Sequence, residues 1–378
     1  MANVYIVCPG LGRVNRGFES FAQECFTALS GEDSELTFFL FKGGGSAQAA
    51  NNIHVCWNIP RSYTLKLVGM DLAYRLENFT FILSLLSKLF TGRPTVILIS
   101  DSFGARYLMR LKKLFRLSYK VLFSNGGPSG PPYRFDYVHQ LTHLHQHEAI
   151  RYGEPSAKHT VVPYGFNFNR SDHRLPTHEI EYLKIRLGIP TAKKIIISVG
   201  AINRLHKRMN YVIDEVAGLE DIYLIMLGQI DEQETAPIIA LAKEKLGTNF
   251  TIKTVPQKEV ALYYACADIF VLGSLREGFG RVYIEALHAG LPVCAHDHEL
   301  TRELLSTHGH FADFTKEGAL AGLLQQLLAN PVSDSARQDY HTYAYNNFSW
   351  DVLKPAYLAM MRSTLQNEYD CAIPAGRA

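Results

Sequence analysis

Short apolar runs alternate with longer amphipathic stretches through the first half of the chain. The apolar runs predict strands at Val4–Cys8, Leu36–Phe41, Thr95–Ser100, Val121–Ser124 and Thr160–Val162. The stretches between them show helical spacing and predict helices at Gly17–Leu29, Leu65–Leu89 and Ala105–Leu117. Strands that alternate with helices form βαβ units, so this half of the chain predicts a parallel sheet.

A second alternating set follows a polar stretch from Asn169 to Pro190, where Pro176 and Pro190 favour a linker that contains a short helix. Strands are predicted at Lys194–Val199, Tyr223–Leu227, Thr251–Val255, Ile269–Leu272 and Pro292–Ala295. Helices are predicted at Lys207–Ala217, Thr235–Leu246, Lys258–Cys266, Arg281–Ala289, Glu299–Ser306, Lys316–Leu328 and Trp350–Leu365.

The pattern therefore predicts an α/β protein with two Rossmann-like, doubly wound domains. A chain of 378 residues also exceeds what one hydrophobic core usually organises. We expect domains at residues 1–172 and 191–348, a linker at 173–190, a C-terminal helix at 349–366 and a tail at 367–378. Ligands of open α/β sheets bind beside the carboxyl ends of the strands, so a cleft between the two sheets is the expected site.

Composition narrows the function. Apolar residues make up 47% and charged residues 20%, as in ordinary soluble proteins, and the net charge of +2 argues against a general nucleic-acid binder. The longest apolar stretch, Phe79–Phe90, is too short to span a bilayer. The cysteines are scattered without a Cys-x-x-Cys pair, which favours reduced, buried thiols. With no visible leader, we expect a cytoplasmic protein.

The most informative segment runs from Ser274 to Leu287. A predicted strand leads into a loop that contains Gly278 and Gly280, and a helix begins near Arg281. Glycines let the backbone approach a ligand, and the free amides of a helix N-terminus suit a phosphate. Glu277 in the loop and Glu285 in the helix lie on either side of that phosphate site. Alternatively, the segment is an ordinary turn with two solvated glutamates.

This segment resembles the signature of retaining glycosyltransferases of the GT-B fold, of the family-4 type (group 1 glycosyl transferases). The matching residues are Ser274, the run Glu277-Gly278-Phe279-Gly280, Glu285 and the turn Gly290-Leu291-Pro292-Val293. The resemblance implies that Glu277 contacts the sugar of a nucleotide-sugar donor and that Glu285 binds its ribose. Gly278, Phe279, Gly280 and Arg281 would complete the donor site. The GT-B fold further implies that the C-terminal helix packs back on the N-terminal domain.

A basic turn follows the strand Lys194–Val199. Departure of a nucleoside diphosphate leaves negative charge that fixed cations stabilise. The family places an arginine and a lysine at this turn, and Lys207 matches the lysine. The usual arginine position holds Ala201, so Arg204 is the expected substitute. A merely solvated basic helix start is less favoured, because cations there oppose the helix dipole.

The first strand ends in a glycine-containing loop, Pro9–Glu19. Its spacing does not meet the dinucleotide-binding fingerprint. It resembles the family's loop over the diphosphate and the acceptor, which implies a phosphate contact for Gly12. The acceptor-side residues predicted from the sequence are Gly10, Arg13, Arg16, Gly17 and His139.

One position departs from the family pattern. Where members place a histidine facing the donor sugar, this chain has Asn125, whose amide can donate or accept a hydrogen bond. Asp101 follows another strand and is either a site residue or a helix N-cap. For the cluster His139, His143, His145 and His147, we favour a polar helix face over a zinc site.

The resemblance implies transfer of a sugar from a UDP- or GDP-type donor to an acceptor hydroxyl with retention, without metal or other cofactor. Two alternatives stay open, a GT-B sugar-nucleotide epimerase and a silent partner subunit of another transferase. The acceptor is a glycan, a lipid-linked group or a small molecule, and no nucleic-acid partner is expected. The basic, leucine-containing segment Ala105–Lys120 leaves open peripheral contact with the inner membrane face.

Overall fold

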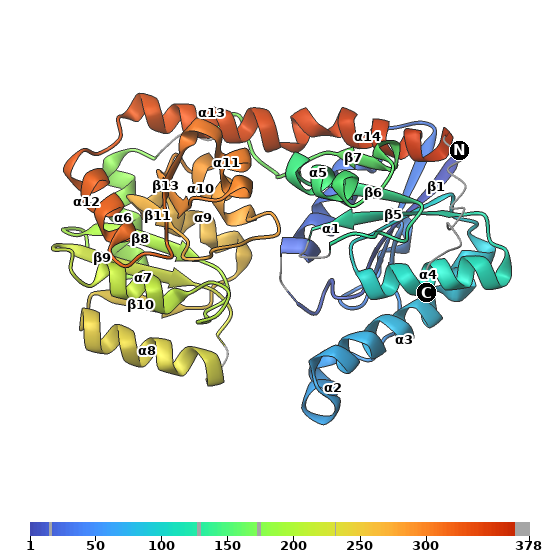
Figure 1. Ribbon diagram of the computed structural model, residues 1–378, viewed down its shortest axis with the longest axis horizontal. Helices are drawn as coiled ribbons and strands as arrows, with labels where there is room; N and C mark the ends of the chain where they lie inside the picture. The colour runs from blue at the N-terminus through green and yellow to red at the C-terminus, as the bar shows by residue number, and fades with distance from the viewer. Residues whose placement is uncertain (15–16, 127–129, 172–174, 231, 367–378) are drawn as a thin grey trace. The chain divides into compact units, whose positions relative to one another are not determined.

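The computed structural model describes residues 1–378 apart from 15–16, 127–129, 172–174, 231 and 367–378 (Figure 1). The chain forms two compact units. Unit 1 consists of Met1–Asn167 and the C-terminal segment from Trp350, and unit 2 consists of Phe168–Ser349. Both units are parallel α/β sandwiches, so the predicted fold class is confirmed.

Unit 1 is built on a seven-stranded parallel sheet in the order β3-β2-β1-β4-β5-β6-β7. Its strands are β1 Ala2–Cys8, β2 Leu36–Lys42, β3 Ile53–Val55, β4 Val96–Ile99, β5 Lys120–Asn125, β6 Tyr137–Gln140 and β7 His159–Val161. Its helices are α1 Gly17–Leu29, α2 Arg61–Val68, α3 Met70–Thr91, α4 Ser102–Phe115, α5 His143–Arg151 and α14 Trp350–Gln366. The strand order reverses between β1 and β4, which makes the carboxyl end of this pair the switch point of the sheet.

Unit 2 is built on a six-stranded parallel sheet in the order β10-β9-β8-β11-β12-β13. Its strands are β8 Lys194–Val199, β9 Ile222–Leu227, β10 Phe250–Lys253, β11 Ile269–Val271, β12 Val293–His296 and β13 Gly309–Ala312. Its helices are α6 Thr177–Leu187, α7 Met209–Val216, α8 Glu232–Leu246, α9 Gln257–Cys266, α10 Arg281–His288, α11 Glu299–Leu305, α12 Ala319–Ala329 and α13 Asp334–Phe348. Here the switch point lies between β8 and β11.

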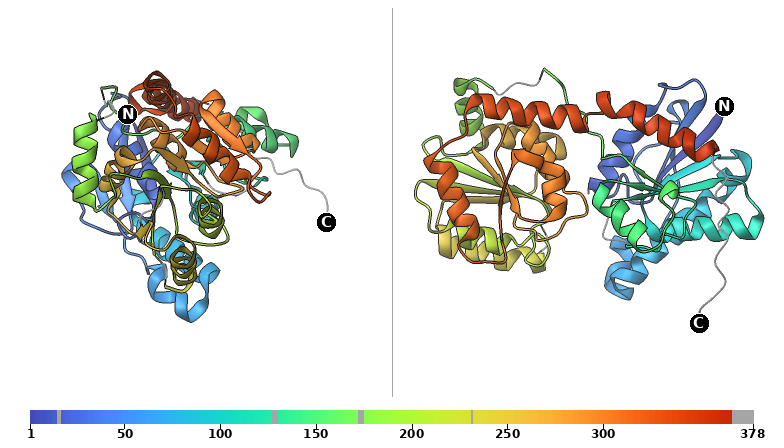
Figure 2. Two further views of the ribbon diagram at one scale, coloured as in Figure 1. Left: turned by 90° about the vertical axis from the view of Figure 1, so that its left-hand side faces the viewer. Right: turned by 45° about the horizontal axis from the view of Figure 1, so that its top comes forward.

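The last helix, α14, belongs to unit 1 although it follows unit 2 in the sequence (Figure 2). It packs beside α1, and the Tyr357 hydroxyl donates a hydrogen bond to the Pro163 carbonyl at 2.9 Å. The Trp350 amide donates to the Phe166 carbonyl at 2.9 Å. The expectation that the C-terminal helix packs on the N-terminal domain is therefore confirmed.

Most predicted elements match the structure to within a few residues, and the differences have local causes. The predicted helix Leu65–Leu89 is two helices, because Gly69 lies between them at φ 76°. Strands β3, β6 and β13 were not predicted; they are three or four residues long and carry histidines or a glutamine. Helix α13 was also not predicted, because its buried face includes polar residues such as Arg337 and His341.

The described part of the chain contains no helix that is both long and apolar enough to cross a bilayer. Five of the cysteines are free and buried, as predicted: Cys8, Cys25, Cys56, Cys266 and Cys294. Cys371 lies outside the described residues.

Candidate functional site

Two charged side chains meet at the switch point of unit 2. Lys207 follows β8 and Glu277 follows β11, and the register Ile196↔Ile269 places these strands side by side. The Lys207 ammonium lies 2.6 Å from Glu277 Oε1, and the two side chains are 14% and 7% exposed. Residues 70 positions apart are thus joined at the edge where α/β proteins bind ligands.

The loop that carries Lys207 is held by its own side chains. Asn203 Oδ1 accepts hydrogen bonds from the amides of His206 and Lys207, at 3.0 and 2.8 Å. The Arg208 guanidinium donates to the carbonyls of Phe314 at 2.9 Å and Gly273 at 3.3 Å. Arg208 is therefore fixed to the protein. Arg204 is exposed and makes no ion pair within the part of the chain that the structure describes.

The loop that carries Glu277 ends in the N-terminus of α10. Gly280 is the N-cap at φ 81°, in the left-handed region that favours glycine. A Cβ added there would lie 2.5 Å from the Tyr283 ring. Because a glycine N-cap has no side chain to accept from the first-turn amides, these amides and the helix dipole can bind an anion.

Glu285 lies in the second turn of α10 and is braced by two neighbours. Its Oε2 accepts a hydrogen bond from the Tyr264 hydroxyl at 3.4 Å, and Arg281 Nε lies 3.9 Å from its Oε1. Burial and the Glu285 charge raise the pKa of Tyr264 well above its usual value, so its hydroxyl remains a donor. Sequence reasoning missed Tyr264 and Asn203, since neither lies in the matching motif.

Two buried hydroxyls lie in the same segment. Ser274 Oγ and the Tyr283 hydroxyl have no hydrogen-bond partner within the described residues. Burial raises the pKa of Tyr283 well above its usual value, and the negative charge of Glu277 adds to the effect. The Tyr283 hydroxyl therefore stays neutral, and both hydroxyls can serve as donors or acceptors for a polar ligand.

In unit 1, the predicted glycine loop crosses the loop that follows β2. The Gly44 amide donates to the Leu11 carbonyl at 3.0 Å, and Arg13 Nε donates to the Gly43 carbonyl at 2.7 Å. Gly12, at φ 85°, approaches so closely that a Cβ would lie 2.3 Å from the Gly44 carbonyl oxygen. The run Gly43-Gly44-Gly45 was missed, although three glycines after a strand were a visible signal.

The remaining loop residues differ in their surroundings. Gly10 is buried, and a Cβ there would lie 2.4 Å from a carboxylate oxygen of Glu19. Gly17 is exposed as the first residue of α1, whereas Arg16 lies outside the described residues. Gly12 and Arg13 are exposed.

The helical interpretation is wrong for His139, which lies in β6. Its ring is fully buried beside Phe21 and Tyr357. Nε2 is 2.7 Å from the Val162 carbonyl and Nδ1 is 3.0 Å from Ser124 Oγ. Both nitrogens are bonded inside unit 1, so the described structure offers no ring atom to an acceptor. The apolar surroundings lower the pKa of His139 to about 4, against a smaller opposing effect of the Val162 bond.

Other sequence candidates have structural roles. Asp101 is the N-cap of α4, with Oδ1 accepting from the amides of Phe103 and Gly104. His143, His145 and His147 lie on α5, and the described residues contain no cluster of three metal-ligating side chains. Asn125 ends β5 and is fully buried, with both amide contacts inside unit 1.

Helices α3 and α4 form a surface that is both apolar and basic. Its exposed apolar side chains include Phe79, Leu83, Phe90, Leu114 and Phe115. Phe90 packs on Phe115 with ring centroids 5.4 Å apart, which joins the two helices into one surface. Exposed Arg106, Arg110 and Lys113 lie on α4, and exposed Arg116 is its C-cap.

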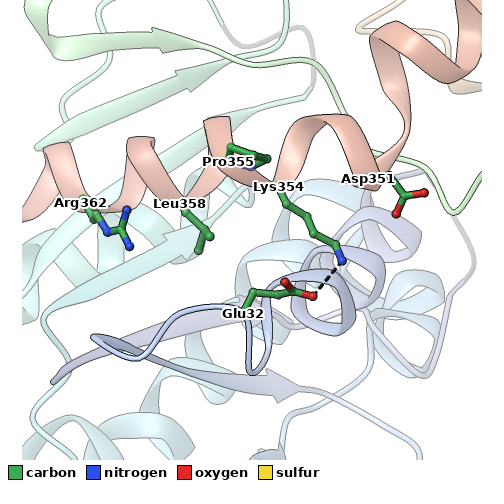
Figure 3. Close-up of a pocket in the computed structure, with 6 residues that line it drawn as sticks. All are labelled: Glu32, Asp351, Lys354, Pro355, Leu358 and Arg362. Carbon is green, nitrogen blue, oxygen red and sulfur yellow. Dashed lines mark hydrogen bonds and ion pairs between the residues drawn. The ribbon is translucent and has the colours of Figure 1, made fainter.

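A hollow of about 460 Å³ lies between α14 and the end of α1 (Figure 3). It is lined by Glu32, Asp351, Lys354, Pro355, Leu358 and Arg362. Lys354 pairs with Glu32 at 2.8 Å, and Arg362 pairs with Asp33. Lys354 and Glu32 thus pair within the hollow, whereas Arg362 pairs with a residue beside it, and none of the lining residues was predicted as functional.

Comparison with known proteins finds a family whose model matches part of the C-terminal half. Residues 179–347 match the model of Glycosyl transferases group 1. The chain is 27% identical over 181 residues to alpha-monoglucosyldiacylglycerol synthase of Streptococcus pneumoniae, covering 45% of this chain and 40% of that protein. It is 27% identical over 176 residues to phosphatidyl-myo-inositol mannosyltransferase of Mycobacterium leprae, covering 44% and 46%. The chain thus spans less than half the length of these curated relatives.

Similar solved structures cover nearly the whole chain. Sucrose-phosphate synthase of Thermosynechococcus elongatus gives a TM-score of 0.76 at 17% identity and covers 96% of this chain and 98% of that chain. HepE of Anabaena, solved with UDP and glucose, gives 0.74 at 14% identity and covers 96% and 100%. At these identities the likeness shows the GT-B fold.

Proposed function

Because residues 179–347 match the model of Glycosyl transferases group 1, we propose that the chain transfers a sugar from a nucleotide-sugar donor to an acceptor hydroxyl. The observation that carries the proposal is the Lys207–Glu277 pair, 2.6 Å apart at the switch point of unit 2. This pair precedes a helix N-terminus that can bind phosphate, and Glu285 follows in the second turn. Glu277, the amides of the helix N-terminus and Glu285 thus match the order sugar, diphosphate and ribose along this segment.

Each group has a distinct part in holding the donor. The Lys207 ammonium has three N–H donors and spends one on Glu277, so the others can reach phosphate oxygens. Arg204 and the amides at Gly278, Phe279 and Gly280 add positive potential for the diphosphate. Glu277 accepts hydrogen bonds from sugar hydroxyls, and Glu285 accepts hydrogen bonds from both hydroxyls of the ribose. The donor is of the UDP or GDP type.

We assign the chemistry to front-face substitution with retention of configuration. The acceptor oxygen bonds to the anomeric carbon as the bond from that carbon to the diphosphate oxygen breaks. The acceptor's proton passes to the departing diphosphate, so no protein base is needed. Glu277 and Glu285 are donor ligands in this scheme and not the flanking carboxylate pair of a glycosidase.

Charge neutralisation by Lys207, Arg204 and backbone amides removes the need for a metal ion. The rate of sugar transfer should therefore be the same with and without EDTA. A strict requirement for Mg²⁺ or Mn²⁺ would contradict this part of the proposal.

The first test measures the binding of UDP, GDP, ADP and TDP by the thermal shift that each of them produces. We expect one of them to stabilise the wild type but not Glu285→Ala, while Glu220→Ala, which removes an exposed carboxylate, behaves as the wild type. If Lys207→Ala bound the same ligand as tightly as the wild type, the diphosphate role of Lys207 would be wrong.

Unit 1 is proposed to bind the acceptor through the Gly10–Gly17 loop, and the α3–α4 surface is proposed to lie on anionic lipid. Exposed aromatic and basic side chains on adjoining helices fit such a membrane interface. The two curated relatives above carry names of lipid-modifying enzymes, which favours a lipid-linked acceptor. Sedimentation with phosphatidylglycerol vesicles should be lost in Leu83→Ser/Leu114→Ser and retained with Tyr182→Ser, an exposed aromatic on α6.

The two alternatives make different predictions. Incubation with nucleotide sugars and water should release nucleoside diphosphate slowly from a transferase. An epimerase would instead produce a new sugar nucleotide, and a silent partner subunit would bind none of them. The Lys207–Glu277 pair and Glu285 favour the transferase.

A further inference from the structure

The carboxyl ends of β5 and β6 carry a chain of buried polar side chains. Asn125 and Gln140 are register partners, and both are fully buried. We propose that Asn125 is a fixed acceptor for a substrate sugar hydroxyl, oriented by a buried hydrogen-bond chain that runs from Gln140 to Glu154. This inference rests on the proposed function for the identity of the ligand.

Both amide hydrogens of Asn125 are used inside the protein. Nδ2 donates to Gln140 Oε1 and to the Tyr133 hydroxyl, each at 2.8 Å. An amide nitrogen has only two hydrogens, so its donor capacity is spent. Burial raises the pKa of Tyr133 to about 12, so its hydroxyl stays neutral.

The orientation of Gln140 is set by the next member of the chain. Gln140 Nε2 lies 3.1 Å from His159 Nδ1, and His159 Nε2 lies 3.0 Å from Glu154 Oε2. A carboxylate only accepts, so Nε2 carries a proton, and in the neutral form of the ring Nδ1 is then an acceptor. Gln140 must then present its NH₂ group to His159 and its carbonyl oxygen to Asn125.

The chain begins at a carboxylate held in its charged form. Burial alone would raise the pKa of Glu154, but hydrogen bonds from His159, the Tyr133 amide and Lys158 outweigh it and lower the pKa. The Lys158 ammonium lies 3.0 Å from Glu154 Oε2. The negative charge of Glu154 thus determines, through two side chains, which way the Asn125 amide faces.

One atom of Asn125 is left without a partner. Its Oδ1 is buried and accepts no hydrogen bond from any described residue. Unpaired buried acceptors are uncommon in native proteins and call for an explanation. A substrate hydroxyl supplies the missing donor, and an imidazole at this position could not present the same fixed carbonyl oxygen. Gln140, His159 and Glu154 are positioning residues in this scheme.

The orientation can be tested without any ligand, through the side-chain amide NMR signals of deuterated protein with ¹⁵N-labelled asparagine. Asn125→Asp identifies the signal by its loss. We expect both hydrogens to exchange slowly in the wild type, and one to exchange at least tenfold faster in Gln140→Leu. If Gln140→Leu does not fold, Tyr133→Phe frees the other hydrogen. Equal exchange rates in wild type and variant would overturn the orienting chain.

The ligand is tested on the same signal with UDP, UDP-glucose, GDP and GDP-mannose. We expect a shift with a nucleotide sugar and none with its nucleoside diphosphate. If the signal shifts only when free glucose or mannose is added to the protein with bound nucleoside diphosphate, the hydroxyl belongs to the acceptor substrate. The role of Asn125 is overturned if its signal shifts neither with a nucleotide sugar nor with a nucleoside diphosphate plus free sugar. Loss of nucleotide binding in Glu285→Ala proves that the wild type binds the nucleotide in this experiment. If no nucleotide binds at all, the proposed function fails and the substrate role fails with it, whereas the exchange result stands.

Kinetics separate positioning from stability. Gln140→Leu should lower kcat about tenfold, the effect of about one hydrogen bond, with unchanged nucleoside diphosphate affinity. Gln140→Glu keeps the acceptor for Asn125 but loses the donor to His159, so it should recover only part of that rate. Asp136→Asn is the control, because Asp136 is a comparably buried side chain that contacts Lys112 and Val121 instead. If Asp136→Asn lowered kcat as much as Gln140→Leu, the role of Gln140 would be structural only.

Discussion

At the scale of single residues, the side chains that touch the donor in our proposal depend on others that do not. Glu285 is oriented by Tyr264, and Lys207 is placed by the two hydrogen bonds that Asn203 accepts. Such supporting contacts fix a binding geometry in advance, which lowers the cost of ordering the site when a ligand arrives.

Removing the hydroxyl of Tyr264 should weaken nucleoside diphosphate binding without unfolding unit 2. Tyr264→Phe keeps the buried ring and deletes only the bond to Glu285. Since one hydrogen bond contributes about 1 kcal/mol, we expect the Kd to rise about threefold to tenfold, as measured by titration calorimetry. Tyr263→Phe is the matched control, because its ring is equally buried but makes no bond to Glu285. Equal losses in both variants would rule out the bracing role.

His139 should make unit 1 less stable in mild acid. Its folded pKa of about 4 lies below the usual 6.5, so the fold favours the neutral ring. The stabilisation is complete above pH 6.5 and is lost as the pH falls towards 4. At pH 5 the loss from this group is about 2 kcal/mol relative to pH 7.5.

Denaturant unfolding at the two pH values measures the effect. His139→Leu should be less stable than wild type at pH 7.5 but should show a smaller difference between the two pH values. His147→Leu, which removes an exposed histidine, should leave the wild-type difference intact. An unchanged difference in His139→Leu would show that this ring is not the titrating group.

At the scale of elements, the turn into α10 combines two constraints on one residue. Gly280 needs a left-handed conformation, and its missing Cβ makes room for the Tyr283 ring. The same turn presents the first-turn amides that we assign to phosphate. Structure and function therefore depend on one backbone geometry.

Gly280→Ala should destabilise unit 2 by about 2 kcal/mol or more, because alanine pays about 1–2 kcal/mol in the left-handed region and also meets the ring. Gly247→Ala is the matched control, since Gly247 lies at φ 61° with open space around its missing Cβ. The difference between the two losses, measured by denaturant unfolding, isolates the contact with Tyr283. Equal losses would show that the ring moves aside freely.

The sequence could predict elements whose side chains repeat with a clear period, such as Gly17–Leu29 and Lys194–Val199, which match their observed bounds. It could also name Lys207, Glu277 and Glu285 as site candidates, because each lies in a local motif, but not the contact between Lys207 and Glu277, which are 70 positions apart. It could not predict α13, whose buried residues Arg337, His341 and Ala344 recur at helical spacing but include two that are usually exposed. The Asn125 chain was beyond reach as well, because strand register brings its members together.

At the scale of the whole molecule, the path of the chain links the two units twice. The chain leaves unit 1 after Asn167 and returns at Trp350. The Trp350 amide donates a hydrogen bond to the Phe166 carbonyl. The Trp350 ring lies against Gly165, where an added Cβ would be 2.4 Å from the nearest ring atom. Trp350 is therefore part of the core of unit 1, although its sequence neighbours on one side belong to unit 2.

Trp350→Ala should lower the stability of unit 1 alone, by about 3–5 kcal/mol, because the ring is 3% exposed and a large cavity would remain. Calorimetry can assign the transitions with Phe81→Ala in the core of unit 1 and Phe314→Ala in the core of unit 2. We expect Trp350→Ala to shift the same transition as Phe81→Ala and to leave the other in place. If it shifted the transition of Phe314→Ala instead, α14 would draw its stability from unit 2. A single merged transition in wild type that stays single in all three variants would show that the units unfold together, and that packing within one unit does not limit its own stability.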